Sequence, residues 1–378
     1  MSFSFSSAAS ATPSSVTGPS ATPSFVTGPF APPSFGGAAH SFTSSTSSST
    51  TSSTPNPTPP LFNLGTAVSS TEKETRTTPG SNGSQSSSSS KHRTPWRGVT
   101  WTEEERVSLV ERLSSYAPCS RDVAQARVLL LGPVGSGKSS FISSVQSVFD
   151  GRVTNRAMVG HGATCFTQKL QCFPLRAPDT TPALELWDSA GFGDVSGPSL
   201  QQLLSVVKGH APEGYTFRPD QALSSDTEGY IKRPGLREQM HCVAFVLDAS
   251  KVFGGSYSKG IGVFLQELRR YISDLGIHQV VLLTHVDKIC SETKKDASEV
   301  YKSSVVQEMT TKAAELVGMS PSSVVPVRNY WCELELNLSS DVLLLRALEL
   351  LVQYTDMFYR EQQRGALKIK TPGIKSDF

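Results

Sequence analysis

The sequence of 378 residues has few of the features that direct a chain to a membrane or out of the cell. No apolar run approaches the roughly 20 residues that a membrane-spanning helix needs. The opening "MSFSFSSAAS" has neither a basic segment nor a long apolar one, and the closing "KSDF" is not a prenylation motif. We therefore expect a cytoplasmic protein with no membrane span.

Cysteine is scarce, and its six residues form neither a C-x-x-C pair nor a Cys/His pattern with metal-ligand spacing. Nothing in this spacing favours a zinc site or a disulfide framework. We therefore expect reduced, mostly buried thiols. The six residues are Cys119, Cys165, Cys172, Cys242, Cys290 and Cys332.

A strong net charge is also missing, since 35 Lys and Arg residues stand against 33 Asp and Glu residues, which gives +2 at pH 7. A protein that neutralises a nucleic-acid backbone normally carries a clustered basic face. We therefore expect no direct binding of nucleic acid.

Residues 1–93 are rich in Ser, Thr, Pro and Gly, with stretches such as "SSTSSSTTSST" and "SQSSSSS". Such a composition cannot bury enough apolar surface to offset chain entropy, so we expect a disordered low-complexity arm. Within it "ATPSSVTGPS" is followed by "ATPSFVTGPF", a decapeptide repeat too short and too rich in proline for a solenoid. The arm is either a duplicated tail without its own function or a phosphorylatable or partner-binding segment that uses Phe25, Phe30 and Phe35 as contacts.

The composition changes at residue 94, where "TPWRGVTWTEEERVSLVERLSSY" begins. Thr102 followed three residues later by Glu105 is a capping-box pattern, and apolar residues then recur at helical spacing. We therefore predict a helical lead-in over residues 94–124, ahead of the main domain.

The stretch "ARVLLLGPVGSGKSSF" joins an apolar run to a glycine-rich loop. The run is short and bounded by glycine, which is typical of a strand buried on both faces. The loop fits G-x-x-x-x-G-K-S, and helical spacing follows it, so strand, loop and helix stand in the order that a phosphate-binding loop requires. Its amides, its lysine and the helix N-terminus are expected to bind phosphate oxygens. The predicted phosphate-binding residues are Gly132, Pro133, Val134, Gly135, Ser136, Gly137, Lys138, Ser139, Ser140 and, further along, Gly191.

Later stretches supply candidates for a metal ion and for sensing the terminal phosphate. "ALELWD" is a second buried-strand pattern, and Asp188 at its end opens "DSAG", a D-x-x-G element. Its carboxylate would hold the Mg²⁺ shell, and the Gly191 amide would meet the γ-phosphate. Either Thr164 or Thr167 could be the switch residue that completes Mg²⁺ coordination, and the spacing does not choose between them. The predicted metal ligands are Ser139, Asp188 and Thr164.

"HCVAFVLDA" and "GIHQVVLLTHVD" read as a third and a fourth buried strand. Asp287 follows the fourth, where a carboxylate accepts the N1 and N2 hydrogens of guanine, a pairing that adenine cannot satisfy. An ordinary loop aspartate is the alternative. Where the usual N/T-K-x-D motif has a lysine packed on the base, this chain has His285, whose ring can cover the base by stacking. The predicted guanine-binding residues are Thr284, His285, Asp287 and, in "SVVPVRNYW", Asn329.

Several stretches are specific to one family rather than to G proteins at large, namely "PWRGVTW", "GYIKRPGLREQMHCVAFVLDA", "LLTHVD" and "NYWCELELNLSSDVLLLRALELL". Through them, and over residues 95–358, the chain resembles the interferon-induced protein 44 family, including its 44-like members. The resemblance implies a GTP-binding, cytoplasmic and antiviral protein, with a G domain similar to those of dynamin-like and other large GTPases. Family members commonly carry a folded TLDc-type domain before the G domain, where this chain has the Ser/Thr/Pro-rich arm.

The hydrolytic half of the predicted site departs from small G proteins. There a glutamine directly after D-x-x-G orients the attacking water, whereas here Phe192 follows Gly191, and a phenyl ring cannot position water. His161, in the loop before Thr164, is the nearest alternative. We therefore expect GTP hydrolysis to be slow or to depend on a partner.

The expected function is guanine-nucleotide binding, with GTP or GDP and Mg²⁺ as cofactors, in a switch or scaffold of interferon-linked antiviral innate immunity, which the resemblance implies. The expected partners are the nucleotide and an unidentified protein or a second copy of the chain. One alternative is a pseudo-GTPase, an interaction module with a structural nucleotide, which Phe192 and His285 favour. The other is an ATP-binding P-loop protein, in which Asp287 would have no base to recognise.

The predicted fold class is α/β: a P-loop, G-domain-like, mainly parallel sheet with helices on both faces, preceded by the disordered arm. We expect the domain to span residues 125–360 and a basic tail to span 361–378. Residues 193–240 are far longer than a simple connection. There we predict a helix over residues 199–207 and then an irregular segment near the nucleotide, either a moving switch or an ordered lid. Two later helices, in "YSKGIGVFLQELRRYISDLG" and "SSDVLLLRALELLVQYTDMFYREQQ", complete the domain.

Overall fold

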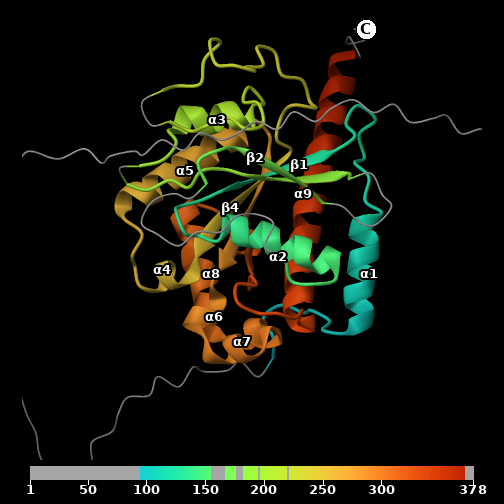
Figure 1. The fold of residues 1–378 in the computed structure, drawn as a ribbon, viewed down its shortest axis with the longest axis vertical. Coiled ribbons are helices and arrows are strands. Elements are labelled where there is room, and N and C mark those ends of the chain that lie inside the picture. The colour runs from blue at the N-terminus through green and yellow to red at the C-terminus, as the bar shows by residue number, and fades with distance from the viewer. Residues whose placement is uncertain (1–93, 155–166, 176–181, 195, 219–220, 371–378) are drawn as a thin grey trace, which may run out of the picture. The chain divides into compact units, whose positions relative to one another are not determined.

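The computed structural model describes residues 94–154, 167–175, 182–194, 196–218 and 221–370, with side chains described as far as residue 365. This part of the chain is an α/β fold in which a six-stranded sheet lies between two layers of helices (Figure 1), as predicted. The strands are β1 (Ala126–Leu131), β2 (Gln171–Leu175), β3 (Leu184–Asp188), β4 (Cys242–Asp248), β5 (His278–Thr284) and β6 (Val324–Pro326). The helices are α1 (Glu103–Ser114), α2 (Lys138–Asp150), α3 (Leu200–Val207), α4 (Ala249–Phe253), α5 (Lys259–Asp274), α6 (Val286–Ile289), α7 (Ser291–Lys295), α8 (Ser304–Val317) and α9 (Leu338–Lys370).

The strand order places the predicted site at the carboxyl ends of the central strands. The order is β2-β3-β1-β4-β5-β6, in which β2 runs antiparallel to β3 and the remaining neighbours are parallel. After β1 the chain forms the edge strand β2, returns to β3 beside β1, and then crosses to β4, β5 and β6 on the other side of β1. In open α/β sheets a ligand binds outside the carboxyl ends of the strands at such a reversal of order. The loop after Leu131 occupies this position.

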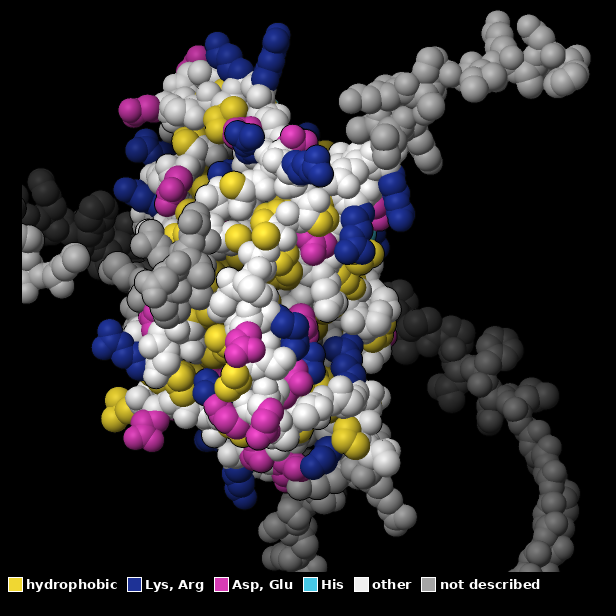
Figure 2. Space-filling view, turned by 90° about the vertical axis from the view of Figure 1, so that its right-hand side faces the viewer, with side chains coloured by type: hydrophobic (Ala, Val, Ile, Leu, Met, Phe, Trp, Pro, Cys, Tyr) yellow, Lys and Arg dark blue, Asp and Glu magenta, His cyan; other side chains and the backbone are white. Residues whose placement is uncertain are grey.

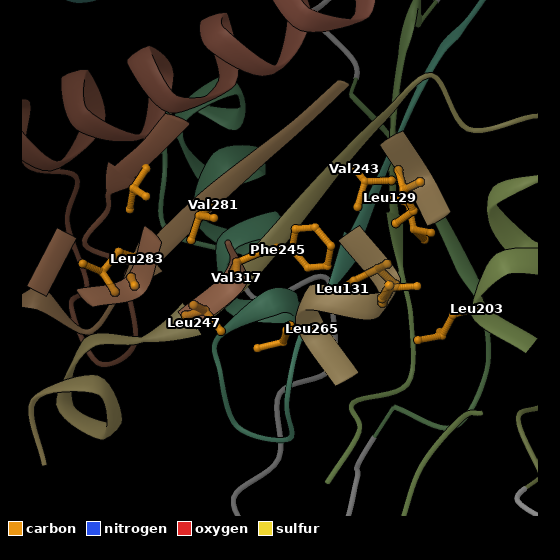
Figure 3. Close-up of a cluster of buried hydrophobic side chains, with 14 of the residues drawn as sticks. Leu129, Leu131, Leu203, Val243, Phe245, Leu247, Leu265, Val281, Leu283 and Val317 are labelled. Carbon is orange, nitrogen blue, oxygen red and sulfur yellow. The ribbon is translucent and has the colours of Figure 1, made fainter. Parts of the chain in front are cut away.

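Each central strand is buried on both faces because its alternate side chains enter two different cores. Odd-numbered positions of β1, β4 and β5 pack with α3, α5 and α8, and Figure 3 shows this first core around Phe245 and Leu265. Even-numbered positions of the same strands pack with α1, α2 and α9. This two-sided burial explains why the strands appear in the sequence as unbroken apolar runs.

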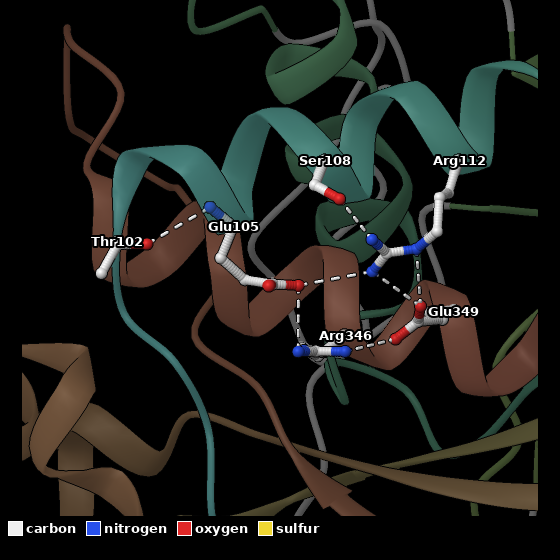
Figure 4. Close-up of polar contacts among 6 residues, drawn as sticks. All are labelled: Thr102, Glu105, Ser108, Arg112, Arg346 and Glu349. Atoms are coloured by element: carbon white, nitrogen blue, oxygen red, sulfur yellow. Dashed lines mark hydrogen bonds and ion pairs between the residues drawn. The ribbon is translucent and has the colours of Figure 1, made fainter.

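The lead-in before β1 docks on the main domain. The Thr102 hydroxyl accepts from the backbone N–H of Glu105 at 3.3 Å, so α1 begins where the capping pattern predicts. Arg112 and Arg346 share Glu105 and Glu349, and this network joins α1 to α9 (Figure 4). The predicted helical lead-in over residues 94–124 is therefore helical over its middle part.

One prediction about the later chain holds and one needs correction. Helix α3 begins at the predicted place with a full capping box at Ser199. Gln202 of α3 holds the irregular segment that follows by donating to the Tyr215 hydroxyl and to two backbone carbonyls. The predicted tail from residue 361 is helical through Lys370, because α9 continues beyond the predicted boundary.

The described surface and thiols also bear on the sequence expectations. All five described cysteines are free, but Cys119 and Cys332 are exposed, so burial holds only for some of them. No described helix combines the length and the apolar character that crossing a bilayer requires. The face drawn in Figure 2 carries Lys and Arg side chains interspersed with Asp and Glu side chains.

A buried histidine joins three distant parts of the fold. His241, just before β4, is fully buried, and its Nδ1 accepts from the backbone N–H of Arg127 and from the Tyr359 hydroxyl, both at 2.8 Å. Its Nε2 donates to the carbonyl of Leu236 at 2.7 Å. The neutral ring thus uses both of its nitrogens in hydrogen bonds. Burial lowers the pKa of His241 to about 4.

Acidification is expected to destabilise the fold through His241. Its folded-state pKa of about 4 lies below the ordinary value of 6.5, so the unfolded chain takes up the proton first as the pH falls. The neutral His241 therefore contributes its full stabilisation above pH 6.5. As the pH falls to 4, the free energy of unfolding decreases by about 3 kcal/mol. Urea unfolding at pH values from 7 to 4 should show the free energy of unfolding decreasing with pH. In His241→Gln the part of this pH dependence that comes from His241 should be missing. Equal slopes in the two chains would contradict the assignment.

Candidate nucleotide site

The loop between β1 and α2 has backbone conformations or close contacts that favour glycine at three positions. Gly135 and Gly137 have φ angles of 74° and 93°, in the left-handed region. A Cβ on Gly132 would lie 2.2 Å from the carbonyl oxygen of Val246 in β4. One on Gly135 would meet nothing within 4 Å, so this part of the loop is open to an approaching ligand. The G-x-x-x-x-G-K-S motif therefore folds as the strand, loop and helix that it predicts.

Lys138 is held inside the curve of this loop. Its side chain is buried, and its ammonium donates to the carbonyl oxygens of Gly132 at 2.9 Å and Pro133 at 3.2 Å. A compact charge in this position faces the space that the loop encloses. The first turn of α2 begins at the same residue, so the positive end of the helix dipole lies beside this charge.

Three oxygen-bearing side chains from separate segments meet beside the loop. The hydroxyl of Ser139 donates to Asp188 Oδ2 at 2.5 Å, and Thr167 Oγ1 lies 3.4 Å from the same oxygen. The two hydroxyls are 3.3 Å apart. Burial raises the pKa of Asp188, although the nearby Lys138 charge opposes this shift. Thr167 is thus placed at the predicted metal site, whereas Thr164 and His161 lie outside the described residues.

The D-x-x-G element is bonded directly to the loop through its backbone. The N–H of Val134 donates to the carbonyl of Phe192 at 3.0 Å, and a Cβ on Gly191 would lie 2.9 Å from Val134 Cα. The ring of Phe192 is 2% exposed and packs 4.9 Å from the ring of Phe264 in α5. Phe192 is therefore a core residue whose ring turns away from solvent, which agrees with its predicted inability to position water.

Two side chains from the ends of β5 and β6 hold the loop in place. The hydroxyl of Thr284, at the end of β5, lies 2.6 Å from the carbonyl oxygen of Ser136 and 3.0 Å from that of Leu247. The amide of Asn329, after β6, donates to the carbonyl of Gly137 at 3.1 Å. Both residues were predicted to contact the base, but Thr284 is fully buried under the loop.

A pocket of about 330 Å³ adjoins the loop at the start of α2. It brings together three of the four predicted guanine-binding residues, His285, Asp287 and Asn329, while Thr284 does not line it. Within the described residues, no hydrogen bond or ion pair engages the carboxylate of Asp287. The other lining residues are Ser140, Ser143, Ser144, Val153, Thr154, Lys288, Tyr330 and Trp331.

His285 takes an unusual backbone conformation at the mouth of this pocket. Its φ of 55° is the one positive value among the described non-glycine residues. His285 is the N-cap of α6, which begins at the next residue. Nδ1 lies 3.0 Å from the Thr284 hydroxyl and 3.4 Å from Asp248 Oδ2, which fixes the ring. Burial lowers the pKa of His285, although Asp248 opposes this shift, so the ring is neutral at pH 7.

Sequence reasoning missed several pocket residues. Ser143 and Ser144 were not predicted, although with Ser140, a predicted phosphate-binding residue, they have helical spacing in "SSFISS" that places all three on one side of α2. Trp331 lines the pocket although 75% of it is exposed, and no local pattern distinguishes it from an ordinary surface tryptophan.

Eight buried side-chain polar atoms have no hydrogen-bond partner within the described part of the chain. Three of them belong to this site: Ser136 Oγ in the loop, Asp188 Oδ1 beside it and Asn329 Oδ1 at the pocket. Buried polar atoms are nearly always bonded in folded proteins, so such a concentration marks a place where a ligand completes the bonding.

The strand order, the glycine loop and the Lys138 geometry define an α/β protein of the P-loop class. Human interferon-induced protein 44 is 35% identical over 278 residues, which cover 72% of this chain and 62% of that protein. The mouse protein is 33% identical over 256 residues, covering 67% and 60%, and human interferon-induced protein 44-like is 32% identical over 273 residues, covering 70% and 60%. The chain belongs to the family of interferon-induced protein 44 and its 44-like members, and it spans about three fifths of the length of these relatives.

A scan against models of protein families finds no match. Among solved structures, the probable GTP-binding protein engB is 13% identical, with 62% of this chain and 100% of that chain covered and a TM-score of 0.34. The structure of the chloroplast translocon components atToc33 and psToc159 is 14% identical, covering 67% and 89%, with a TM-score of 0.38. Because these TM-scores are low, the fold assignment rests on the strand order and the loop of this chain.

Thr284→Val is expected to destabilise the fold more than a matched loss of a hydroxyl elsewhere. It leaves the carbonyl of Ser136 without the side-chain partner that holds the loop, which costs roughly 1–3 kcal/mol. Thr355→Val is the control, because that buried hydroxyl bonds only to a carbonyl of its own helix. Urea unfolding measures the free energy of unfolding of both variants. An equal decrease in the two would show that the Thr284 hydroxyl does not hold the loop.

Proposed function

We propose that the protein binds guanine nucleotide, GTP or GDP, with Mg²⁺ at this site. The observation that carries the proposal is the position of Asp287 in a pocket that adjoins the phosphate loop. A carboxylate there accepts both the N1 and N2 hydrogens of guanine, whereas adenine offers no such pair and would leave the acid unpaired. The neutral ring of His285, fixed by Asp248, supplies a flat surface beside the base.

The loop residues fit the phosphate end of such a ligand. The open approach at Gly135 and the N-terminus of α2 present backbone N–H groups to an anion. Lys138 provides a fixed charge next to them. The support from Thr284 and Asn329 keeps these donors in place, so they need little reorganisation when the nucleotide binds.

The residues near Asp188 fit a hard divalent cation. Two hydroxyls and a buried carboxylate with one unpartnered oxygen are the ligand types that Mg²⁺ prefers. Ser139 and Thr167 would hold the ion directly, and Asp188 would hold its water shell. When bound, the ion offsets phosphate charge and orients the phosphates.

Hydrolysis is expected to be slow unless a partner assists it. Phe192 occupies the place of a water-orienting residue and is buried against Phe264. We infer a switch or scaffold that retains its nucleotide, acting in the cytoplasm in the interferon-linked antiviral response that the family implies, with a protein partner or a second copy of the chain. The second candidate is a pseudo-GTPase with a structural nucleotide, which the same burial of Phe192 favours.

Exchange of one pocket side chain tests the base assignment. Asp287→Asn replaces two acceptor oxygens by an acceptor and a donor, so it should weaken Mg²⁺·GDP binding by roughly 100-fold and improve binding of xanthosine diphosphate. Calorimetric titration of the full chain with each nucleotide measures both effects.

The control for this exchange is Asp274→Asn, which removes the same charge from an exposed position at the end of α5. It should leave both affinities unchanged. Unchanged GDP affinity in Asp287→Asn, or an equal loss in the control, would show that Asp287 does not recognise the base.

A further inference from the structure

A second lysine reaches the phosphate loop from outside the G-K-S motif. Lys251 lies in α4, three residues after β4 ends at Asp248. Its ammonium donates to the carbonyl oxygen of Val134 at 3.2 Å and lies 5.9 Å from the centre of the Tyr257 ring. The side chain is half-buried, so this charge is partly withdrawn from water.

Val134 lies where Lys251 approaches the loop. It is in close contact with Gly191, the last residue of the D-x-x-G element, and its N–H donates to the carbonyl of the next residue, Phe192. None of Val134, Gly191 and Lys251 lines the base pocket. On the proposed function, the Gly191 amide meets the terminal phosphate, so Lys251 stands at the γ-phosphate end of the site.

The charge of Lys251 is not balanced by a carboxylate within the described residues. The nearest acid in sequence, Asp248, is engaged elsewhere: Oδ1 accepts from the N–H and hydroxyl of Ser250, and Oδ2 faces His285. Within the described residues this half-buried ammonium contacts one carbonyl and one ring, whereas such groups usually have an anionic partner. A bound triphosphate would bring that anion.

We propose that Lys251 distinguishes GTP from GDP by binding the γ-phosphate. The lysine stem is flexible, so the ammonium can leave the Val134 carbonyl and donate to a phosphate oxygen nearby. Charge-assisted hydrogen bonds are the strong ones, and only the triphosphate offers this bond. Lys251 thus supplies the terminal-phosphate recognition that the buried Phe192 does not, and the inference rests on the proposed function.

The test compares two nucleotides on four full-length chains. Affinities for GDP and for GTPγS, each with Mg²⁺, are measured for the parent, Lys251→Gln, Lys251→Arg and Lys259→Gln. The last is the control, since Lys259 is an exposed lysine at the start of the next helix. Lys251→Gln should weaken GTPγS binding about tenfold or more and leave GDP binding unchanged.

The remaining chains separate the possible outcomes. Lys251→Arg should keep most of the preference for GTPγS, and Lys259→Gln should keep all of it. If Lys251→Gln alters GDP and GTPγS binding equally, or alters neither, the role of Lys251 is overturned while the guanine site stands. If the parent binds neither nucleotide, the proposed function itself fails.

Discussion

The candidate site depends on one buried hydroxyl that joins the end of β5 to the phosphate loop. Thr284 lies between the carbonyl oxygens of Ser136 and Leu247, so it fixes the loop relative to both β4 and β5. His285, the next residue, turns into the left-handed region and directs α6 and Asp287 toward the pocket. The base end and the phosphate end of the site are therefore set by adjacent residues of one strand end.

The charges around the loop are distributed in a way that suits an anionic ligand with a cation. Lys138 and Lys251 approach the loop from different elements, and both donate to its own carbonyls. Asp188 lies buried beside two hydroxyls with one unpartnered oxygen. A nucleotide with its metal ion would bring phosphate oxygens to these lysines and a cation to the unpartnered oxygen of Asp188.

The phosphate end of the site could be predicted from the sequence because its chemistry is local. The motif from Gly132 to Ser139 fixes both the backbone and the donors, and the apolar runs around it mark strands buried on both faces. Asp188 and Asp287 were found because Asp188 ends one such strand and Asp287 lies three residues after the end of another. The caps at Thr102 and Ser199 were equally local signals for helix starts.

The rest of the site depends on contacts between distant segments, which no local pattern records. Thr284 stands in the base-recognition motif, yet its position under the loop follows from how β5 packs beside β4. The contact of Lys251 with Val134 joins residues far apart in the chain. Helix α8 was also missed, although Val306, Met309, Ala313 and Val317 have helical spacing, because Thr and Ala residues between them weaken the apolar pattern.

The most direct test of the account is the stoichiometry and base selectivity of the unmodified full chain. Calorimetric titration with Mg²⁺·GDP and with Mg²⁺·ADP measures both quantities. The account predicts one GDP bound per chain and ADP binding weaker by roughly 100-fold or more, because adenine leaves the half-buried carboxylate of Asp287 unpaired. Equal binding of the two nucleotides, or binding of neither, would contradict the assignment of this pocket to guanine.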